Sequence, residues 1–245
     1  MFAALLKKFP NLSQLGLILP LYALSFVIMG IAVAPALAFF SARFEWVSPE
    51  SEILRWIVSG IAAVLAYFVY GFVLIFLVPA VNLLILPFVK AGRGVYHAPG
   101  TIVWYAHNNL TYIVRFTFLQ FITPSPFNLL FYKMMGMKIG RGVQINSTNI
   151  SDPGLITLED YVTIGGSATL AAHYGVAGFL IRSPIVIRKG ATVGLKATLL
   201  GGVEIGEGST IMPNSFIAPK MKIPGGELWG GIPAVCIRSK KENKT

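Results

Sequence analysis

One histidine stands alone in the second half of the chain. His173 is the only histidine of residues 137–245. Its neutral imidazole can take a proton from a hydroxyl or an amine near neutral pH. Two acids precede it, Asp152 and Glu159, and either could hold the ring in one tautomer. The alternatives are a surface histidine without a role and, for Asp152, a turn residue before Pro153.

These residues belong to a stretch with a period of six. Residues 187–222 form six consecutive blocks, each opening on an aliphatic residue with a small or apolar residue four places later. No helix has this period. A chain that turns a corner every six residues lays short strands on the three faces of a prism, so three blocks complete one coil. The opening aliphatic side chains then point inward, and the coils gain stability by stacking.

The same frame continues upstream, where it is broken twice. It is marked there by Ile139, Ile145, Leu158, Ile164 and Leu170. Residues 151–157 are one residue too long for a block. The step from Leu170 to Ile187 is seventeen residues where one block would be six. We therefore expect eleven extra residues to leave the wall as a loop that begins beside His173.

Three features together resemble the hexapeptide-repeat acyltransferases: the six-residue frame, the loop that opens after His173, and the ending Trp-Gly-Gly-Ile-Pro-Ala of residues 229–234. The resemblance implies a left-handed parallel β-helix and a homotrimer. It also implies acetyl-CoA or another short-chain acyl-CoA as co-substrate, with no metal. Residues 134–140 and 152–160 look most like the C-terminal β-helical region of membrane-embedded poly-lysine-synthetase-type proteins.

The resemblance also suggests roles for individual residues. In the family, a histidine at the start of such an excursion is the general base of acyl transfer, and His173 matches that place. Asn146, twenty-seven residues upstream, resembles the asparagine that contacts the acceptor in sugar acetyltransferases. The alternative for Asn146 is an asparagine that stacks between coils. Asp152 and Glu159 complete the expected catalytic set.

The donor would lie in a groove between two prisms of the trimer, as in the family. Small residues would let the pantetheine arm approach backbone amides, basic residues would hold the phosphates, and the C-terminal motif would close the groove. For each lysine, the alternative is an ordinary solvated charge. The expected donor-binding residues are Gly194, Lys196, Ala197, Gly201, Ala218, Lys220, Lys222, Trp229, Gly231 and Pro233, with Arg238 as a further phosphate candidate.

The composition excludes an ordinary soluble protein. Of 245 residues, 55% are hydrophobic and 12% are charged. The net charge of +10 is spread along the chain, which suits anionic phospholipid and a phosphorylated small molecule. Nothing in the pattern supports nucleic-acid binding. The single cysteine, Cys236, rules out an internal disulfide.

Two apolar runs predict a transmembrane hairpin. Residues 15–40 carry no charge, and their twenty-six residues exceed the ~20 that a bilayer core requires. Residues 53–78 form the second run. Lysine and arginine flank the outer ends of the hairpin, so we expect both termini and the coils on the cytoplasmic side of the inner membrane. A secretory signal peptide is the alternative for the first run, because residues 36–38 resemble a cleavage site.

The connection between hairpin and coils is rich in aromatic residues. Residues 101–123 could form a third span, but His107, Asn108 and Asn109 would be costly in hydrocarbon. We expect a helix lying in the membrane interface instead. The predicted organisation is a two-helix anchor (1–90), an aromatic interfacial linker (91–136) and a β-helix catalytic domain (137–245).

The sequence thus predicts a membrane-anchored, acyl-CoA-dependent O- or N-acyltransferase. Its acceptor would be a hydroxyl or amine of a membrane-associated or amphiphilic molecule. Two alternatives stay open: a carrier-dependent, amide-forming condensation domain and a non-catalytic trimeric membrane scaffold. A carbonic anhydrase on this scaffold needs three histidines around a metal, whereas His97 and His107 lie outside the coils. A nucleotidyltransferase is unsupported, because no strand with a Gly-rich phosphate loop precedes the coils.

Overall fold

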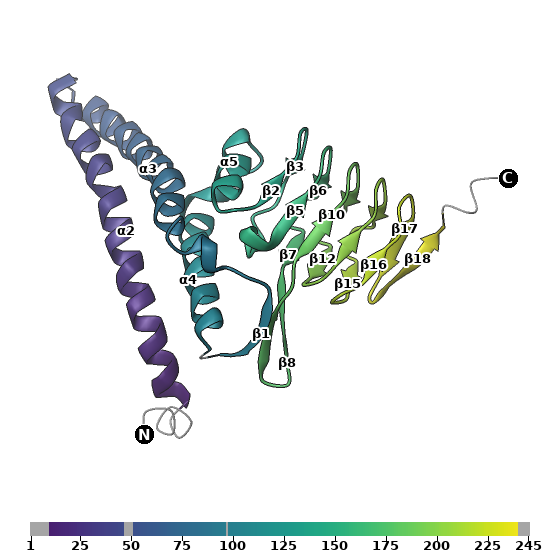
Figure 1. Ribbon diagram of the computed structural model, residues 1–245. Coiled ribbons are helices and arrows are strands. Elements are labelled where there is room, and N and C mark those ends of the chain that lie inside the picture. The colour runs from purple at the N-terminus through teal and green to yellow at the C-terminus, as the bar shows by residue number, and fades with distance from the viewer. Residues whose placement is uncertain (1–9, 47–50, 97, 240–245) are drawn as a thin grey trace. The chain divides into compact units, whose positions relative to one another are not determined.

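The computed structural model describes residues 10–46, 51–96 and 98–239 (Figure 1). The chain divides into two units, Met1–Ala80 and Val81–Thr245. The first unit holds two long helices, and the second holds the coils together with the short helices and the strand that precede them.

Two long helices occupy the two predicted apolar runs. Helix α2 spans Pro10–Trp46 and helix α3 spans Glu52–Asn82. Both contain a stretch long and apolar enough to cross a bilayer. Large apolar side chains such as Phe26 and Trp56 are exposed along them, the pattern of helices that face hydrocarbon. The helices are therefore confirmed, while the membrane crossing itself stays a prediction.

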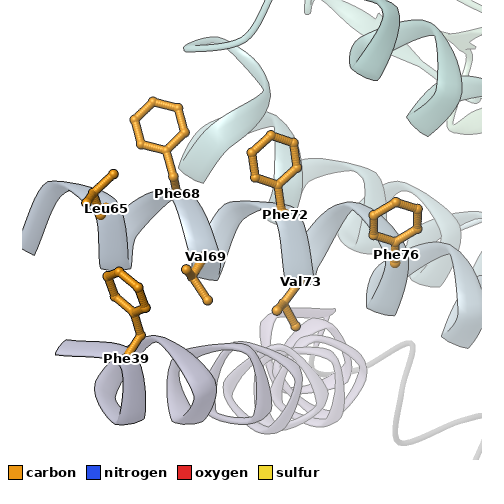
Figure 2. A pocket seen from close by; sticks show the side chains of 7 residues that line it. All are labelled: Phe39, Leu65, Phe68, Val69, Phe72, Val73 and Phe76. Carbon is orange, nitrogen blue, oxygen red and sulfur yellow. The ribbon is translucent and has the colours of Figure 1, made fainter. Parts of the chain in front are cut away.

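A wholly apolar groove of about 520 Å³ opens between these helices (Figure 2). Phe39 of α2 lies on one side, and aliphatic and phenylalanine side chains of α3 lie on the other. Near one end the helices are joined by a hydrogen bond from Arg43 Nε to Ser59 Oγ at 3.4 Å. The lining residues are Phe39, Leu65, Phe68, Val69, Phe72, Val73 and Phe76.

The predicted prism is confirmed as three parallel sheets that stack coil upon coil. The first face holds β2 (Lys138–Ile139), β5 (Ile156–Leu158), β10 (Ile185–Ile187), β13 (Glu204–Ile205) and β16 (Lys222–Ile223). The second holds β3 (Gln144–Ile145), β6 (Thr163–Ile164), β11 (Thr192–Val193), β14 (Thr210–Ile211) and β17 (Leu228–Gly231), closed by antiparallel β18 (Ala234–Arg238). The third holds β4 (Ile150–Ser151), β7 (Thr169–Ala171), β12 (Thr198–Leu200) and β15 (Phe216–Ile217).

The register between coils follows the eighteen-residue repeat. Ile187 pairs with Ile205, and Ile205 pairs with Ile223. These side chains are almost completely buried, since the block-opening aliphatic residue points into the prism. On the second face Val193 pairs with Ile211 in the same way. A ladder of identical inward positions therefore forms the core, as the sequence frame predicts.

The second break in the frame is a β-hairpin. Leu158 pairs with Ile187, twenty-nine residues later, so eleven residues beyond the repeat leave the wall. They form β8 (His173–Val176) and β9 (Phe179–Arg182). Strand β1 (Gly92–Val95) adds to β9 as a third, antiparallel strand. The predicted excursion is confirmed, and it is a strand pair that begins at His173.

The first break lies one residue earlier than the frame alone indicates. On the third face, Ile150 points inward and pairs with Leu170. Ile150 comes five residues after the inward residue Ile145 and eight residues before the inward residue Leu158. The extra residues follow it. Asp152 has φ 62°, in the left-handed region, and a 3-10 turn, η3 (Pro153–Leu155), comes next. The chain therefore leaves the wall at Asp152.

The segment between the long helices and the coils packs within the second unit. It contains η1 (Leu86–Phe88), β1, α4 (Pro99–Val114), a π turn η2 (Arg115–Leu119) and α5 (Pro126–Met134). Helix α4 buries His107, Asn108 and Thr111. His107 and Asn108 are two of the three polar residues that argued against a third span, and they are buried in protein. Contact of this helix with a membrane surface stays a prediction.

Glycines that follow an inward residue let the coils stack closely. At Gly194 a Cβ would lie 2.5 Å from the backbone nitrogen of Pro213, in the next coil. We expect Gly194→Ala to lower the free energy of unfolding by about 2 kcal/mol, because backbone cannot give way as a flexible side chain can. Urea unfolding of the full chain in detergent measures this. Gly175→Ala is the control, since its Cβ would meet only Tyr96 Oη at 3.7 Å, and equal effects would contradict the prediction.

Candidate active site

The candidate site is a histidine–aspartate pair at the edge of the third face. Nδ1 of His173 lies 2.6 Å from Oδ2 of Asp152. The Asp152 side chain is fully buried, whereas that of His173 is 23% exposed. Within the described part of the chain, no hydrogen bond reaches Nε2 of His173. The geometry suits an imidazole whose Nδ1 is fixed by Asp152 and whose Nε2 is able to accept a proton from a substrate.

The two breaks in the repeat bring these residues together. Ser151 of β4 pairs with Ala171 of β7 on the third face. Asp152 follows Ser151 directly, and His173 follows Ala171 after one residue. At both points the chain leaves the wall of the prism. Residues twenty-one apart in the chain therefore emerge side by side.

Helix α4 supplies two further donors to the Asp152 carboxylate. Nε1 of Trp104 donates to Oδ1, and Nδ2 of Asn108 donates to the same oxygen at 2.6 Å. Oδ1 of Asn108 also accepts the backbone N–H of Asp152 at 3.2 Å. The Trp104 ring meets the His173 ring edge to face, with centroids 4.8 Å apart. Both residues of the pair thus contact the same side chain of α4.

A buried arginine lies close to the same carboxylate. Arg182 of β9 is the cross-strand partner of His173 and is 8% exposed. Its Nη1 donates to the carbonyl of Gly100, at the start of α4. Burial lowers the pKa of Arg182, and the negative charge of Asp152 opposes this. The guanidinium therefore contributes positive charge to the surroundings of Asp152.

His107, the other described histidine, supports the turn behind Asp152. Its Nδ1 lies 2.8 Å from Oδ1 of Asn82, and its Nε2 faces the N–H of Gly154 at 3.5 Å. Burial lowers the pKa of His107 to about 4, against a raising effect from Asp152. The ring is therefore neutral near pH 7, with its proton on Nδ1, because Nε2 faces a donor.

Polar contacts with the coils continue along α4 and into η2. Tyr112 Oη lies 3.0 Å from Ser151 Oγ, and Arg115 donates to Oδ1 of Asn149. Our sequence analysis assigned none of these α4 residues to the site, because it placed the whole segment at the membrane interface. The available signal was the four-residue spacing of Trp104, Asn108 and Tyr112, which puts polar atoms on one helix face.

The structure separates the other predicted catalytic residues from His173. Glu159 accepts hydrogen bonds from Arg188 at 2.8 Å and from the Lys189 backbone at 3.0 Å. The bond from Arg188 lowers the pKa of Glu159, as expected for an exposed ion pair. Asn146 is exposed beside Gly166, at the end of β3. Of the two acids that the sequence offered, the structure therefore pairs Asp152 with His173.

The predicted donor-binding residues lie at several different places in the coils and the C-terminal hairpin. Gly201 packs against the wall beside the site, where a Cβ would lie 3.1 Å from the His173 backbone nitrogen. Gly194 and Ala197 serve coil packing. The C-terminal hairpin holds Trp229, whose Nε1 donates to Glu227 at 2.8 Å. The remaining residues are half-buried Ala218 and the exposed Lys196, Lys220, Lys222, Gly231, Pro233 and Arg238.

Three known proteins are similar to parts of this chain, although no family model matches it. Delta-poly-L-ornithine synthetase of Acinetobacter baumannii is 32% identical over 105 residues, which are 43% of this chain and 8% of that protein. Gamma carbonic anhydrase 2 of Arabidopsis thaliana is 35% identical over 97 residues, 39% of this chain and 31% of that protein. The Bacillus subtilis protein YvoF, named for an acetyltransferase activity, is 24% identical over 151 residues, which are 57% of this chain and 86% of that protein.

Solved structures of acetyltransferases also align with the chain. One from Vibrio cholerae, bound to acetyl-CoA, gives a TM-score of 0.47 at 20% identity and covers 59% of this chain and 91% of its own. A maltose O-acetyltransferase of Clostridium difficile gives a TM-score of 0.48 at 14% identity and covers 62% of this chain and 94% of its own. The resemblance predicted from the repeat, the excursion and the poly-lysine-synthetase-like segments is confirmed by the sequence relatives, as a similarity over part of this chain.

The low pKa of His107 predicts acid-sensitive folding. An unfolded histidine binds a proton below about pH 6.5, whereas the folded His107 does so only near pH 4. The free energy of unfolding should therefore fall between pH 6.5 and 4, by on the order of 3 kcal/mol from this residue. In His107→Gln this part of the pH dependence should disappear. Urea unfolding of the wild type and of His107→Gln at pH 7 and pH 4.5 measures how far the free energy of unfolding falls with pH in each protein. An equal fall in both would contradict the assignment.

Proposed function

We propose that this protein transfers an acyl group, most simply acetyl, from acyl-CoA to a hydroxyl or amine, with His173 as the general base. The observation that carries the proposal is the 2.6 Å pairing of His173 Nδ1 with buried Asp152, which leaves Nε2 without a partner among the described residues. Two donors from α4 already occupy Oδ1 of Asp152. A carboxylate held in this way accepts from Nδ1–H, and the lone pair of Nε2 is then available.

The chemistry follows from that tautomer. As the acceptor oxygen or nitrogen attacks the thioester carbonyl, Nε2 takes the proton that the acceptor loses. When the tetrahedral intermediate collapses, the carbon–sulfur bond breaks and the imidazolium returns the proton to the coenzyme A thiolate. Asp152 stabilises the imidazolium in between and keeps the ring oriented. Backbone amides near the groove would stabilise the oxyanion.

The donor proposal rests on the resemblance and on exposed lysines. Lys196, Lys220 and Lys222 are exposed, and none forms an ion pair within the described residues. Unpaired ammonium groups suit the phosphates of coenzyme A. Gly201 packs against the backbone of Ala172 and His173, so it supports the wall beside the base and does not by itself open space for the pantetheine arm. The groove itself would require a second prism of a homotrimer.

We also propose that the acceptor is membrane-associated or amphiphilic, with the coils on the cytoplasmic side of the inner membrane. The support is the pair of apolar helices long enough to cross a bilayer. They precede α4, the helix that contacts the site, in the same chain. Asn146 stays a candidate for acceptor contact, whereas Glu159, predicted as a partner of the histidine ring, is bound to Arg188 and Lys189 instead.

A second candidate function is favoured by the similarity to Delta-poly-L-ornithine synthetase, at 32% identity over 105 residues. In that case the base would serve amide formation on a carrier-bound acyl group in place of free acyl-CoA. Dependence on a phosphopantetheine-bearing carrier protein distinguishes the two donors. The chain spans 8% of that relative, so this activity is proposed only as the alternative.

The test is transfer of labelled acetyl from acetyl-CoA to a lipid and metabolite extract of the source cells by the detergent-purified chain. We expect His173→Gln to reduce the rate by about 10³-fold, because general-base catalysis contributes 10²–10⁴-fold. Asp152→Asn should reduce it strongly as well, since the opposite tautomer is then favoured. Arg141→Gln is the control, because that side chain is 85% exposed in a surface ion pair. Undiminished transfer by His173→Gln would refute the proposal.

A further inference from the structure

We propose that Trp104 and Asn108 of helix α4 are positioning residues, which set the orientation and the proton affinity of His173 by holding Asp152. This inference rests on the proposed function, because it concerns the base of that same reaction. It goes beyond it by making a helix outside the repeat a part of the catalytic unit. Both residues donate to Asp152, and the Trp104 ring also packs on the ring of His173.

The first argument is the conformation of Asp152. Its φ of 62° lies in the left-handed region, which is unfavourable for a residue with a Cβ, although aspartate adopts it more readily than most residues. Asn108 contacts this residue at two points, by accepting its backbone N–H at 3.2 Å and by donating to Oδ1 at 2.6 Å. A side chain that contacts both the backbone and the carboxylate fixes both at once.

The second argument is the balance of charge around the buried carboxylate. A fully buried carboxylate is tolerated only when its oxygens accept several hydrogen bonds. Trp104 and Asn108 supply both bonds to Oδ1, and His173 supplies the bond to Oδ2. Arg182 of β9 adds positive charge nearby in the wild type and in the variants alike. Removing one α4 donor therefore leaves the negative charge less compensated, so the carboxylate should attract the proton on His173 more strongly.

The third argument is the placement of the donors on α4. Trp104 and Asn108 are four residues apart, one helical turn, and therefore face the same way. His107 faces the turn that follows Asp152, through the N–H of Gly154 at 3.5 Å. The Trp104 ring also packs on the His173 ring, so it limits rotation of the imidazole. Three side chains of one helix thus hold the segment that carries the aspartate.

The test uses Trp104→Phe, which keeps an aromatic ring against His173 but removes the Nε1–H donor. Full-length protein labelled with [¹⁵N]histidine in detergent has three histidines, and His173→Gln assigns the signal. We expect the titration of His173 to move to higher pH in Trp104→Phe and to lower pH in Asp152→Asn. Adding Trp104→Phe to Asp152→Asn should then cause no further change, because the route through the carboxylate is gone. Trp56→Phe, at an exposed tryptophan of α3, is the matched control and should leave the titration unchanged.

Activity gives an independent readout. Where acetyl transfer is measurable, Trp104→Phe should lower kcat roughly tenfold, with an unchanged KM for acetyl-CoA and an acidic limb of the pH profile moved to higher pH. A His173 titration identical in wild type and folded Trp104→Phe would overturn the proposal. A wild-type protein that transfers nothing would refute the proposed function alone, since the NMR titration still decides whether α4 controls His173.

Discussion

The cost of burying the Asp152 carboxylate explains how the excursion and helix α4 meet at the first coils. A charge removed from water is stable in protein only when its acceptor positions are filled, and leaving one donor out costs several kcal/mol. Here the donors come from the excursion strand, through His173, and from helix α4, through Trp104 and Asn108. These two segments are therefore held against the first coils by the same charge.

The regular repeat forms the packed core of the coils, and the two breaks in it supply the side chains of the candidate site. Where the eighteen-residue repeat is unbroken, identical inward positions stack and the wall is closed, as along Ile187, Ile205 and Ile223. Chemistry requires side chains that leave this wall, and each break supplies one. The 3-10 turn after Ile150 delivers Asp152, and the eleven-residue excursion delivers His173. Neighbouring coils stack in register, so the two breaks lie next to each other.

Helix α4 illustrates why one composition can be interpreted in two ways. A run of aromatic residues with few charges suits a membrane interface, and it equally suits a helix packed against protein. The polar atoms decide between them. His107 and Asn108 are buried because Asn82, Gly154 and Asp152 provide partners, and these contacts span up to forty-seven residues of sequence. Such partners cannot be recognised from the run itself.

The sequence alone determined the coils, the length and start of the excursion, and the two long apolar helices. A period of six and a run of uncharged residues are local patterns, and the short strands and long helices that they predict depend mainly on neighbouring residues. It also offered His173 as the base, but it left Asp152 and Glu159 as equal partners. Only the tertiary structure decided for Asp152, placed Glu159 in an ion pair with Arg188, and brought α4 to the site. The physical reason is that a buried charge is satisfied by donors gathered from distant segments, and their distances exist only in the folded chain.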